Sequence, residues 1–476
     1  MKLPLALSLL AFQGTVLAAD QVVTLGDSLT FSYKGEFGFS VNVPLTGTVG
    51  DNMPDTVRNW IETLSSTTYR NTSFDQGASK SIRLDFRPFG KLYTLFLRND
   101  YNWAIPGLKI DAMRRFVLGE ATFTQLIAES DEFKVIGDAL KASDFTDATH
   151  FNHADMVSQI SSSAERLVFF IGGNDVRGIY GTVYNGGSAG SFTDDFIADA
   201  DAILDRVRVL NPNIQIVVVA VPHIGITPDI KKTAPTDPVK TPRMTALLSD
   251  LNARLRTVAE EHGAGFADVF TPTLPLLGSG SYGIHGIPFN NSGSTNGDLN
   301  YIWLNGKLSA NFHPNTNVQL EIANTIVRAF NTRYNTSIAP LSATEMLGAL
   351  EKSAAADMNF ASWMTGFGLS GGLENSDADG DGIPAGVEFA TGLNPAIQDA
   401  DLISSSVVNA GTQLQLAYPK RLPSSTRFTL QAASSTTLTS PFTPVPSSAG
   451  ADGLNRATIP SGGGRGFLRL EATVAP

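Results

Sequence analysis

Three polar residues stand at the ends of apolar runs or at the start of a helical pattern, far apart in the chain. Ser28 follows a short β-branched run and a Gly-Asp pair, Asn174 follows the most apolar run, and His313 opens a helical pattern. A short apolar run that ends at glycine predicts a buried strand of a parallel sheet, and ligands bind beyond the carboxyl ends of such strands. Ser28 therefore lies where a nucleophile would be useful. Acyl transfer needs a nucleophile, a base and N–H donors for a developing oxyanion, and these three residue types can supply them.

Each of these residues also has an ordinary structural interpretation. A serine after a strand can cap the next helix, an Asn-Asp pair after a strand is usually a turn, and a histidine before proline is typical of a helix start. Two Gly-x-Ser-x-Gly segments, around Ser188 and Ser370, lie in Gly-rich stretches without the buried strand and following helix of a nucleophile elbow, so we interpret both as flexible loops. The other histidines have no motif around them and are expected to be structural or solvated: His150, His153, His223, His262 and His285.

The elements that must position the polar residues follow from an alternation of apolar β-rich runs with helical patterns over residues 20–335, which predicts an α/β sheet. A polar insertion at about 30–92 is expected to cover the site and influence substrate choice. The apolar runs lie at 22–25, 91–97, 166–171, 214–221 and 265–270, and the helical patterns at 56–64, 194–210, 243–262 and 316–334.

Composition limits the class of protein. With 476 residues and 42% hydrophobic content, the chain can bury a large core and is expected to hold more than one domain. A net charge of −11 argues against nucleic acid or an anionic membrane surface as a partner. Residues 1–19 have the charged start, short apolar core and small-residue end of a secretory signal peptide, which predicts a secreted or extracytoplasmic protein. No later segment is long and apolar enough for an integral membrane segment, and the chain has no cysteine for disulfides.

Four short segments, in chain order, contain the candidate residues: Gly26-Asp27-Ser28-Leu29, Gly107, Gly172-Gly173-Asn174-Asp175 and His313-Pro314. Together they resemble the four sequence blocks of the SGNH (GDSL) hydrolase family. The resemblance covers residues 20–335 and implies a flavodoxin-like three-layer sandwich with a central parallel sheet. The segment 221–228 also looks like the loop after the fourth strand in that family.

The resemblance implies a serine esterase or lipase-like acylhydrolase that needs no cofactor for catalysis. Ser28 is expected to be the nucleophile and His313 the general base. The backbone N–H groups of Ser28 and Gly107, together with the side-chain amide of Asn174, are expected to form the oxyanion hole. Glycine suits this role because the backbone can come close, and asparagine suits it because its amide is a neutral donor.

One position departs from the family pattern. The family usually carries an aspartate three residues before the histidine, and here that position is Ala310. Loss of the orienting acid can cost up to about 10⁴ in kcat where it alone fixes the histidine tautomer. A backbone carbonyl near Ala310 is the favoured replacement. The alternatives are the amides of Asn311 and Asn305, and the carboxylate of Asp298.

A second motif lies downstream, in the twelve residues 377–388. They fit a calcium loop at every diagnostic position, and the loop resembles the single EF-hand-like or thrombospondin-type-3-like loops of secreted bacterial proteins. A structural Ca²⁺ between domains is expected, whereas the alternative is a solvated acidic linker. Gly382 would take the sharp turn, and the expected ligands are Asp377, Asp379, Asp381, the carbonyl of Ile383, and Glu388.

The predicted domains and functions follow. The chain is divided into a signal peptide at 1–19, a hydrolase domain at 20–335, a linker with a short helix (342–356) at 336–375, the calcium-binding loop at 376–398 and a β-rich module at 400–476. The leading function is hydrolysis of carboxylic esters, with a small-molecule, lipid or glycan ester as the substrate. The alternatives are a carbohydrate (acetyl) esterase on polysaccharide and a non-catalytic surface or binding protein that keeps the fold.

Overall fold

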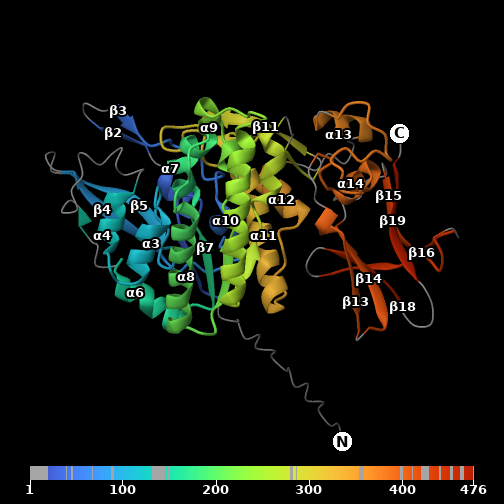
Figure 1. Cartoon of the computed structure of the whole chain (residues 1–476), viewed down its shortest axis with the longest axis horizontal. Coiled ribbons are helices and arrows are strands. Elements are labelled where there is room, and N and C mark those ends of the chain that lie inside the picture. Colours follow the sequence, from blue (N-terminus) through green and yellow to red (C-terminus); the bar gives the residue numbers. More distant parts are fainter. Residues whose placement is uncertain are drawn as a thin grey trace, which may run out of the picture.

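The structure is a computed structural model of the whole chain (Figure 1). The predicted signal peptide lies outside the described residues. Those residues are 20–38, 40–43, 47–66, 68–86, 91–130, 145–146, 151–278, 282–285, 287–352, 359–367, 369–396, 400–409, 411–419, 428–438, 441–450, 454–460 and 466–474.

A parallel sheet in the order β1-β7-β8-β9 forms the centre of the fold. Its strands are fully or largely buried, as expected for short apolar runs covered on both faces. A further extended segment runs parallel beside β1, where Tyr101 accepts a hydrogen bond from the N–H of Thr24 at 3.0 Å. The strands are β1 (Val22–Gly26), β7 (Arg166–Phe170), β8 (Gln215–Val219) and β9 (Gly265–Ala267).

Helices cover this sheet and complete the predicted three-layer α/β sandwich. Figure 1 shows α8 (Phe192–Leu210) and α10 (Thr241–Glu261) side by side over the sheet, and the two helices contact each other. Helix α11 (Thr316–Tyr334) packs on β8, β9 and α2 (Trp60–Leu64). The predicted helices at 194–210, 243–262 and 316–334 are therefore confirmed within two residues, and the fold class is confirmed as α/β.

Shorter elements connect and surround these layers. In the first half of the chain they are α1 (Tyr33–Glu36), β2 (Val41–Val43), β3 (Gly47–Val49), β4 (Ser79–Phe86), β5 (Lys91–Asn99), α3 (Ile110–Val117), α4 (Phe123–Glu129), β6 (Phe145–Thr146), α6 (His153–Ser158), η3 (Gln159–Ser163), α7 (Gly173–Tyr184), η4 (Ile224–Ile226) and α9 (Pro228–Thr233). Later they are η5 (Thr271–Leu277), β10 (Tyr282–Ile284), β11 (Ile287–Ser294), η6 (Thr295–Gly297), β12 (Tyr301–Leu304), α12 (Ala343–Ala349), α13 (Phe360–Gly366), α14 (Ala385–Thr391) and η7 (Ala400–Leu402).

The apolar run 91–97 does form a strand, but outside the parallel sheet. Strand β5 pairs antiparallel with β4, and β4 pairs antiparallel with β6, in a separate three-stranded sheet. An apolar run predicts a buried strand without naming its partner, and the adjacent β4 is available for a local hairpin.

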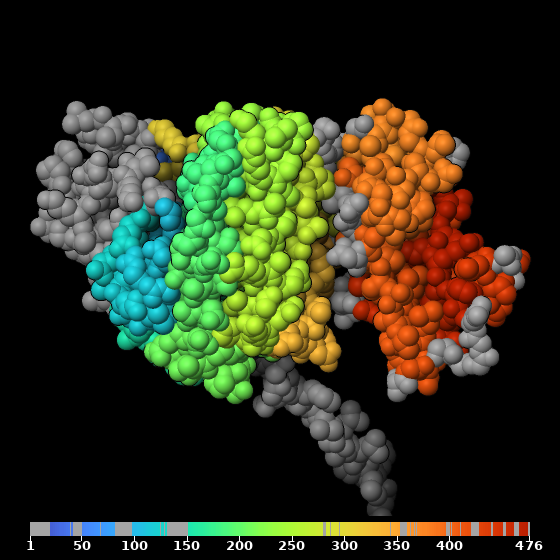
Figure 2. Space-filling view, in the orientation of Figure 1, coloured from blue at the N-terminus to red at the C-terminus, as the bar shows by residue number. Residues whose placement is uncertain are grey.

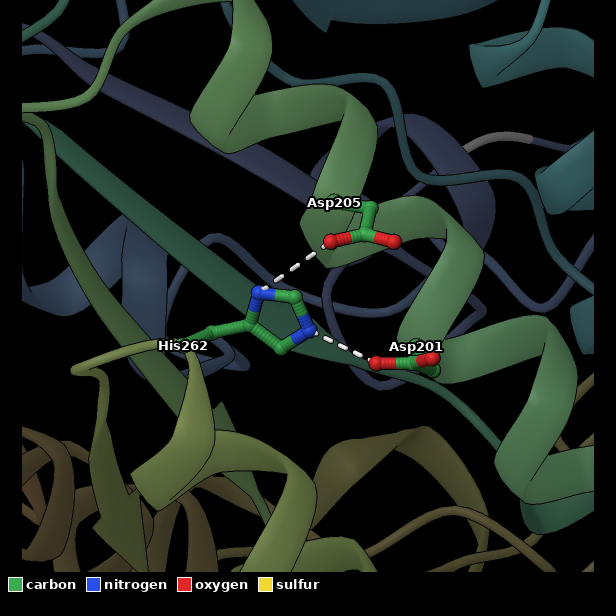
Figure 3. Close-up of side chains that lie close together, drawn as sticks. All are labelled: Asp201, Asp205 and His262. Carbon is green, nitrogen blue, oxygen red and sulfur yellow. Dashed lines mark hydrogen bonds and ion pairs between the residues drawn. The ribbon is translucent and has the colours of Figure 1, made fainter.

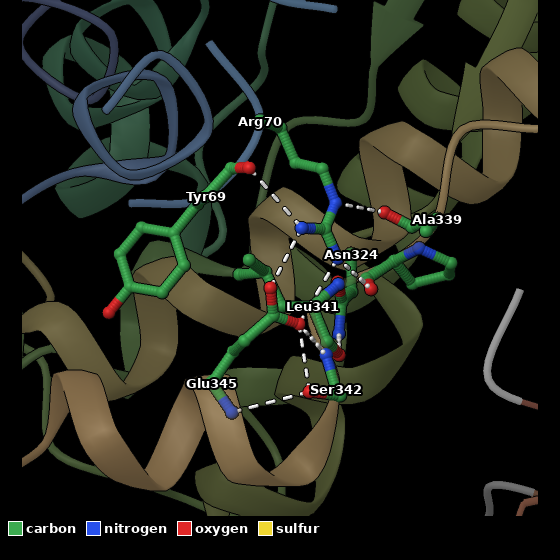
Figure 4. A network of polar contacts seen from close by, with 8 residues as sticks. Tyr69, Arg70, Asn324, Ala339, Leu341, Ser342 and Glu345 are labelled. Atoms are coloured by element: carbon green, nitrogen blue, oxygen red, sulfur yellow. Dashed lines mark hydrogen bonds and ion pairs between the residues drawn. The ribbon is translucent and has the colours of Figure 1, made fainter. Parts of the chain in front are cut away.

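The segment after α11 packs on the α/β domain as part of the same core. Its apolar residues Ile338, Leu341, Met346 and Leu350 belong to the main hydrophobic cluster. Arg70 ties the segment down, because its guanidinium pairs with Glu345 at 2.7 Å and donates to the carbonyl of Ala339 at 2.6 Å (Figure 4). Helix α12, with Ser342 as its N-cap, forms the first half of the short helix predicted at 342–356 and ends at Ala349, and residues 353–356 lie outside the described residues.

The C-terminal region is β-rich, as predicted. Figure 2 shows it beside the helices of the α/β domain, and α13 contacts β11 of that domain. Two antiparallel sheets, β13-β14-β18-β17 and β16-β15-β19, enclose a small core that includes Leu416 and Tyr418. Their strands are β13 (Ser404–Val408), β14 (Gln413–Tyr418), β15 (Phe428–Ser435), β16 (Thr443–Val445), β17 (Ser447–Ala449), β18 (Asn455–Pro460) and β19 (Phe467–Val474).

Within the described part of the chain, none of the helices combines the length and apolar character needed to cross a membrane.

Candidate active site

Ser28 lies at the carboxyl end of β1, in a tight turn with no room for a larger residue at Gly26. A Cβ at Gly26 would stand 2.6 Å from the carbonyl oxygen of Phe170 on β7. The next residue, Asp27, is 2% exposed and accepts the backbone N–H of Leu29 at 3.0 Å, and it also accepts N–H groups of Gly172 and Gly173. The Asp27 carboxylate therefore joins the ends of β1 and β7 and fixes the position of Ser28.

His313 lies against Ser28, although the two residues are 285 positions apart in the chain. Its Nε2 is 2.7 Å from the Ser28 Oγ, and its Nδ1 is 3.1 Å from the carbonyl oxygen of Ser309. Because a carbonyl can only accept, Nδ1 must carry the proton, and Nε2 is left with the lone pair that accepts the serine O–H. This is the tautomer that a general base requires.

The carbonyl of Ser309 orients His313, a role for which the sequence left several candidates. It lies one residue before Ala310 and matches the favoured backbone carbonyl. The other candidates are engaged elsewhere. Asp298 accepts from the backbone and side-chain amides of Asn300 at 2.9 and 2.7 Å, and the amide of Asn311 donates to Asn305 at 2.9 Å.

The ring of His313 is enclosed by aromatic side chains. Tyr33, Phe37 and Phe312 lie with ring centroids 6.4, 5.1 and 5.6 Å from the imidazole. This burial lowers the pKa of His313 to about 4, whereas the hydrogen bond to Ser309 opposes the shift. The imidazole is therefore neutral, and able to take a proton, through the mildly acidic range.

Asn174 and Gly107 lie on neighbouring segments at the same edge of the sheet. Asn174 is the second residue of α7, and its side-chain amide donates to the carbonyl of Leu108 at 3.2 Å. This bond uses one of the two N–H groups of the amide and leaves the other for a ligand. Gly107 has a φ of +71°, a conformation that favours glycine, and it follows Ile105, whose N–H donates to Gly26 at 3.1 Å. The structure thus gathers the segments of all four predicted residues.

A second acid, the partly buried Asp175, holds the same segments together and was not predicted. Its carboxylate accepts the N–H of Ile110 at 3.2 Å and so joins α7 to the segment that contains Gly107. Burial raises the pKa of Asp175 to about 7 and that of Asp27 to about 7. Asp27 belongs to the Gly-Asp pair before Ser28, and Asp175 belongs to the Asn-Asp pair. The sequence of these pairs did not indicate that their acids bind backbone N–H groups.

Ser28 lines a cavity of 1290 Å³ that extends along α11 as far as residues such as Leu393 and Leu454 of the C-terminal region. Ser28 and Asn174 both line it, together with the apolar side chains of Ile224, Trp303 and Phe312. An uncharged acyl or alcohol group would therefore be desolvated against apolar walls beside the serine hydroxyl.

The downstream acidic loop brings three of its predicted ligands together. Oxygen atoms of Asp377, Asp379 and Asp381 lie within 4.8 Å of one another, at the position of a bend that precedes α14. Gly382 has a φ of +90°, as the predicted turn requires. Glu388 lies on α14 and is fully buried.

Another His-Asp cluster connects two helices of the α/β domain. His262, at the end of α10, lies between Asp201 and Asp205 of α8, with nitrogen–oxygen distances of 2.7 and 3.8 Å (Figure 3). One imidazole engages a carboxylate through each of its ring nitrogens, which suits a bridge between helices. His223 is also internal, and its Nδ1 accepts the N–H of Gly225 at 3.2 Å.

The sequence matches one family model and no curated protein. Residues 143–319 match the GDSL-like lipase/acylhydrolase family, a stretch that contains Asn174 and His313 and begins after Ser28. No curated protein matches the chain significantly. The family match supports the resemblance to the SGNH (GDSL) hydrolases, and the chain is an ester-hydrolysing enzyme.

Solved structures include three distant likenesses. A carbohydrate esterase of family 3 from Talaromyces cellulolyticus is 12% identical and covers 67% of this chain and 99% of its own, with a TM-score of 0.30. A variant of Axe2, an acetyl xylan esterase from Geobacillus stearothermophilus, is 12% identical and covers 66% and 95%, with a TM-score of 0.30. An extracellular lipase from Streptomyces rimosus is 15% identical and covers 67% and 99%, with a TM-score of 0.32. Because these TM-scores are below 0.5, the fold assignment depends on the observed strand order.

The buried imidazole predicts activity at acidic pH. Protonation of His313 removes the base, so kcat/KM should fall as the pH drops through about 4, well below the ordinary histidine value of about 6.5. The measurement is the pH profile of kcat/KM for a short-chain aryl ester between pH 3.5 and 8. A descending acid limb centred near pH 6.5 would contradict a buried, neutral His313.

The contacts of Asp298 predict that it is dispensable for the reaction. Because its carboxylate is bonded to Asn300, the variant Asp298→Ala should keep most of the wild-type kcat. Steady-state hydrolysis by Asp298→Ala and His313→Ala, assayed side by side, provides the comparison. If the two variants lose activity to a similar extent, Asp298 supplies the missing acid and the carbonyl does not.

Proposed function

We propose that the protein hydrolyses carboxylic esters through an acyl-enzyme, with Ser28 as the nucleophile and His313 as the general base. The observation that supports this proposal is the 2.7 Å contact between the Ser28 Oγ and the His313 Nε2, together with the bond from Nδ1 to Ser309. A serine–histidine contact with the histidine oriented by a third group is the arrangement that activates a hydroxyl.

The steps follow from these positions. The Ser28 oxygen attacks the ester carbonyl carbon while its proton passes to Nε2 of His313. The oxyanion accepts hydrogen bonds from the backbone N–H groups of Ser28 and Gly107 and from the Asn174 amide. The intermediate collapses to an acyl-serine as the imidazolium returns the proton to the leaving alcohol. Water then attacks the acyl-serine and gives a proton to His313. The imidazolium returns this proton to the Ser28 oxygen as the carboxylic acid leaves, which restores the free serine and the neutral histidine.

The apolar walls of the cavity favour an uncharged ester as the substrate. Ile224, Trp303 and Phe312 offer apolar surface in the cavity that Ser28 lines. Comparison of acetylated glycan with medium-chain acyl esters distinguishes the leading function from a polysaccharide acetyl esterase. We also propose that residues 1–19 direct export, on the basis of their sequence pattern alone.

The proposed nucleophile has a matched control in the same chain. Ser28→Ala should lower kcat for a short-chain aryl ester by at least about 10⁴-fold, because the acyl-enzyme cannot form. Ser188→Ala removes the serine of a Gly-x-Ser-x-Gly segment outside the site and should leave kcat unchanged. An active Ser28→Ala enzyme would show that another residue is the nucleophile. A wild-type protein without esterase activity would favour the non-catalytic alternative.

We further propose that the loop at 377–388 binds a structural Ca²⁺. The close approach of Asp377, Asp379 and Asp381 supports the proposal, because three carboxylates within 4.8 Å repel each other unless a cation or protons intervene. Burial raises the pKa of Asp379 to about 6, and the charges of Asp381 and Asp377 add to this shift. The carbonyl of Ile383 and the carboxylate of Glu388 would complete the oxygen ligands.

A structural Ca²⁺ predicts a specific effect of chelation. With a Kd of about 10⁻⁴–10⁻³ M, 10 mM Ca²⁺ should stabilise the C-terminal module by about 2 kcal/mol, so EGTA should lower its melting temperature by several degrees. The transition of the α/β domain should move less. Calorimetry of the full chain, with Asp377→Asn/Asp381→Asn as the insensitive control, tests this. Identical melting curves with Ca²⁺ and with EGTA would rule out the structural ion.

A further inference from the structure

We propose that Asp51 is a positioning residue for His313, which it serves by holding the turn whose carbonyl orients the imidazole. This role depends on the function proposed above for His313 as a general base. Asp51 lies in the long insertion between β1 and β5, more than 250 residues from the turn in sequence, so no local motif links the two.

The contacts of Asp51 converge on the backbone of the turn. Its Oδ1 accepts the N–H groups of Lys307 and Leu308, the latter at 3.1 Å, and its Oδ2 accepts the N–H of Ser309 at 3.0 Å. The carbonyl of the same Ser309 accepts the Nδ1–H of His313. The Asp51 carboxylate thus holds Ser309, and the carbonyl of Ser309 sets the tautomer of His313. Hydrogen bonds to a charged acceptor are the stronger kind, and they confine the direction of the backbone.

The turn is shaped to receive this carboxylate. A Cβ at Gly306 would stand 2.2 Å from the carboxyl carbon of Asp51, so glycine leaves the space that the side chain occupies. Ala310 and Asn311 have φ values of +47° and +60°, which are unusual for residues with side chains. A backbone in this region is retained only where surrounding contacts hold it in place. The hydrogen bonds to Asp51 lie immediately before these two residues and provide such contacts.

Asp51 also contributes a negative charge near the imidazole. The charged groups that face His313 are Arg177 of α7, Asp229 of α9 and Asp51 of the insertion. Arg177 and Asp229 pair with each other at 2.7 Å, so their effects on His313 largely cancel. The Asp51 carboxylate favours the imidazolium that forms when His313 takes the serine proton. It therefore supplies part of the electrostatic effect that an aspartate at position 310 would provide.

The variant Asp51→Asn tests the role with little change in shape. The asparagine side chain has no charge and only one acceptor oxygen. It therefore cannot accept all three N–H groups of the turn, and the carbonyl of Ser309 is held less firmly. We expect kcat for a short-chain aryl ester to fall about 10–100-fold with KM nearly unchanged, because the loss is in the orientation of the base. The acid limb of kcat/KM should move to lower pH, since the removed negative charge had favoured the protonated imidazole.

A nearby aspartate provides the matched control. Asp55 lies in the same insertion, its side chain is 75% exposed, and it pairs with Lys34 at 3.3 Å. Asp55→Asn should leave kcat and the pH profile as in the wild type. An Asp51→Asn enzyme that melts earlier but keeps the wild-type kcat and acid limb would show a purely structural role and overturn the inference.

A measurement without substrate separates this inference from the proposed function. Proton NMR should show a protected Nδ1–H of His313 in the wild type, and Asp51→Asn should exchange that proton faster. If the wild type lacks esterase activity but this difference is present, the proposed function fails and the positioning role stands. If the wild type is active and Asp51→Asn keeps both kcat and the protected proton, the positioning role alone fails.

Discussion

The site depends on one neutral hydrogen bond, from the Nδ1–H of His313 to the carbonyl of Ser309. This bond decides which ring nitrogen carries the proton, and therefore whether Nε2 can accept the proton of Ser28 at 2.7 Å. An aspartate in this role would fix the tautomer and also stabilise the imidazolium. A carbonyl fixes the tautomer equally well, because it too can only accept, but it offers a dipole in place of a charge. Compared with an aspartate, the carbonyl of Ser309 keeps the orienting effect on His313 but lacks the negative charge that would stabilise the imidazolium.

The difference between a carbonyl dipole and a carboxylate charge is important because His313 is buried. Tyr33, Phe37 and Phe312 exclude water from the imidazole, which lowers the pKa of His313 and makes protonation in the reaction more costly. Low local polarity also strengthens the effect of any charge that remains nearby. The carboxylate of Asp51, bound to the turn before Ala310, is therefore placed where its charge favours the protonated imidazole. Positioning and electrostatics come from the same side chain.

Local patterns in the sequence were sufficient to predict the sheet and the residues at its edge. The β-branched run before Ser28 and the apolar run before Asn174 end at the same edge because parallel strands place their carboxyl ends together. Strand β5 shows the limit of such patterns, since an apolar run does not identify its partner strand. Asp51, Asp27 and Asp175 show a second limit, because an acid that binds backbone N–H groups looks in sequence like any polar loop residue. Their roles depend on contacts between distant segments, which neither spacing nor composition encodes.

The strained turn before His313 explains why a distant carboxylate is suited to this task. A left-handed conformation costs about 1–2 kcal/mol for a residue such as Ala310, and Asn311 adds a smaller cost because asparagine tolerates this region. A hydrogen bond to a charged group contributes about 1.5–3 kcal/mol, so two of the three bonds to Asp51 are enough to offset the strain. The family aspartate would act from within the turn, whereas here the turn is held from outside. The long insertion after β1 is therefore tied to the turn whose carbonyl orients His313.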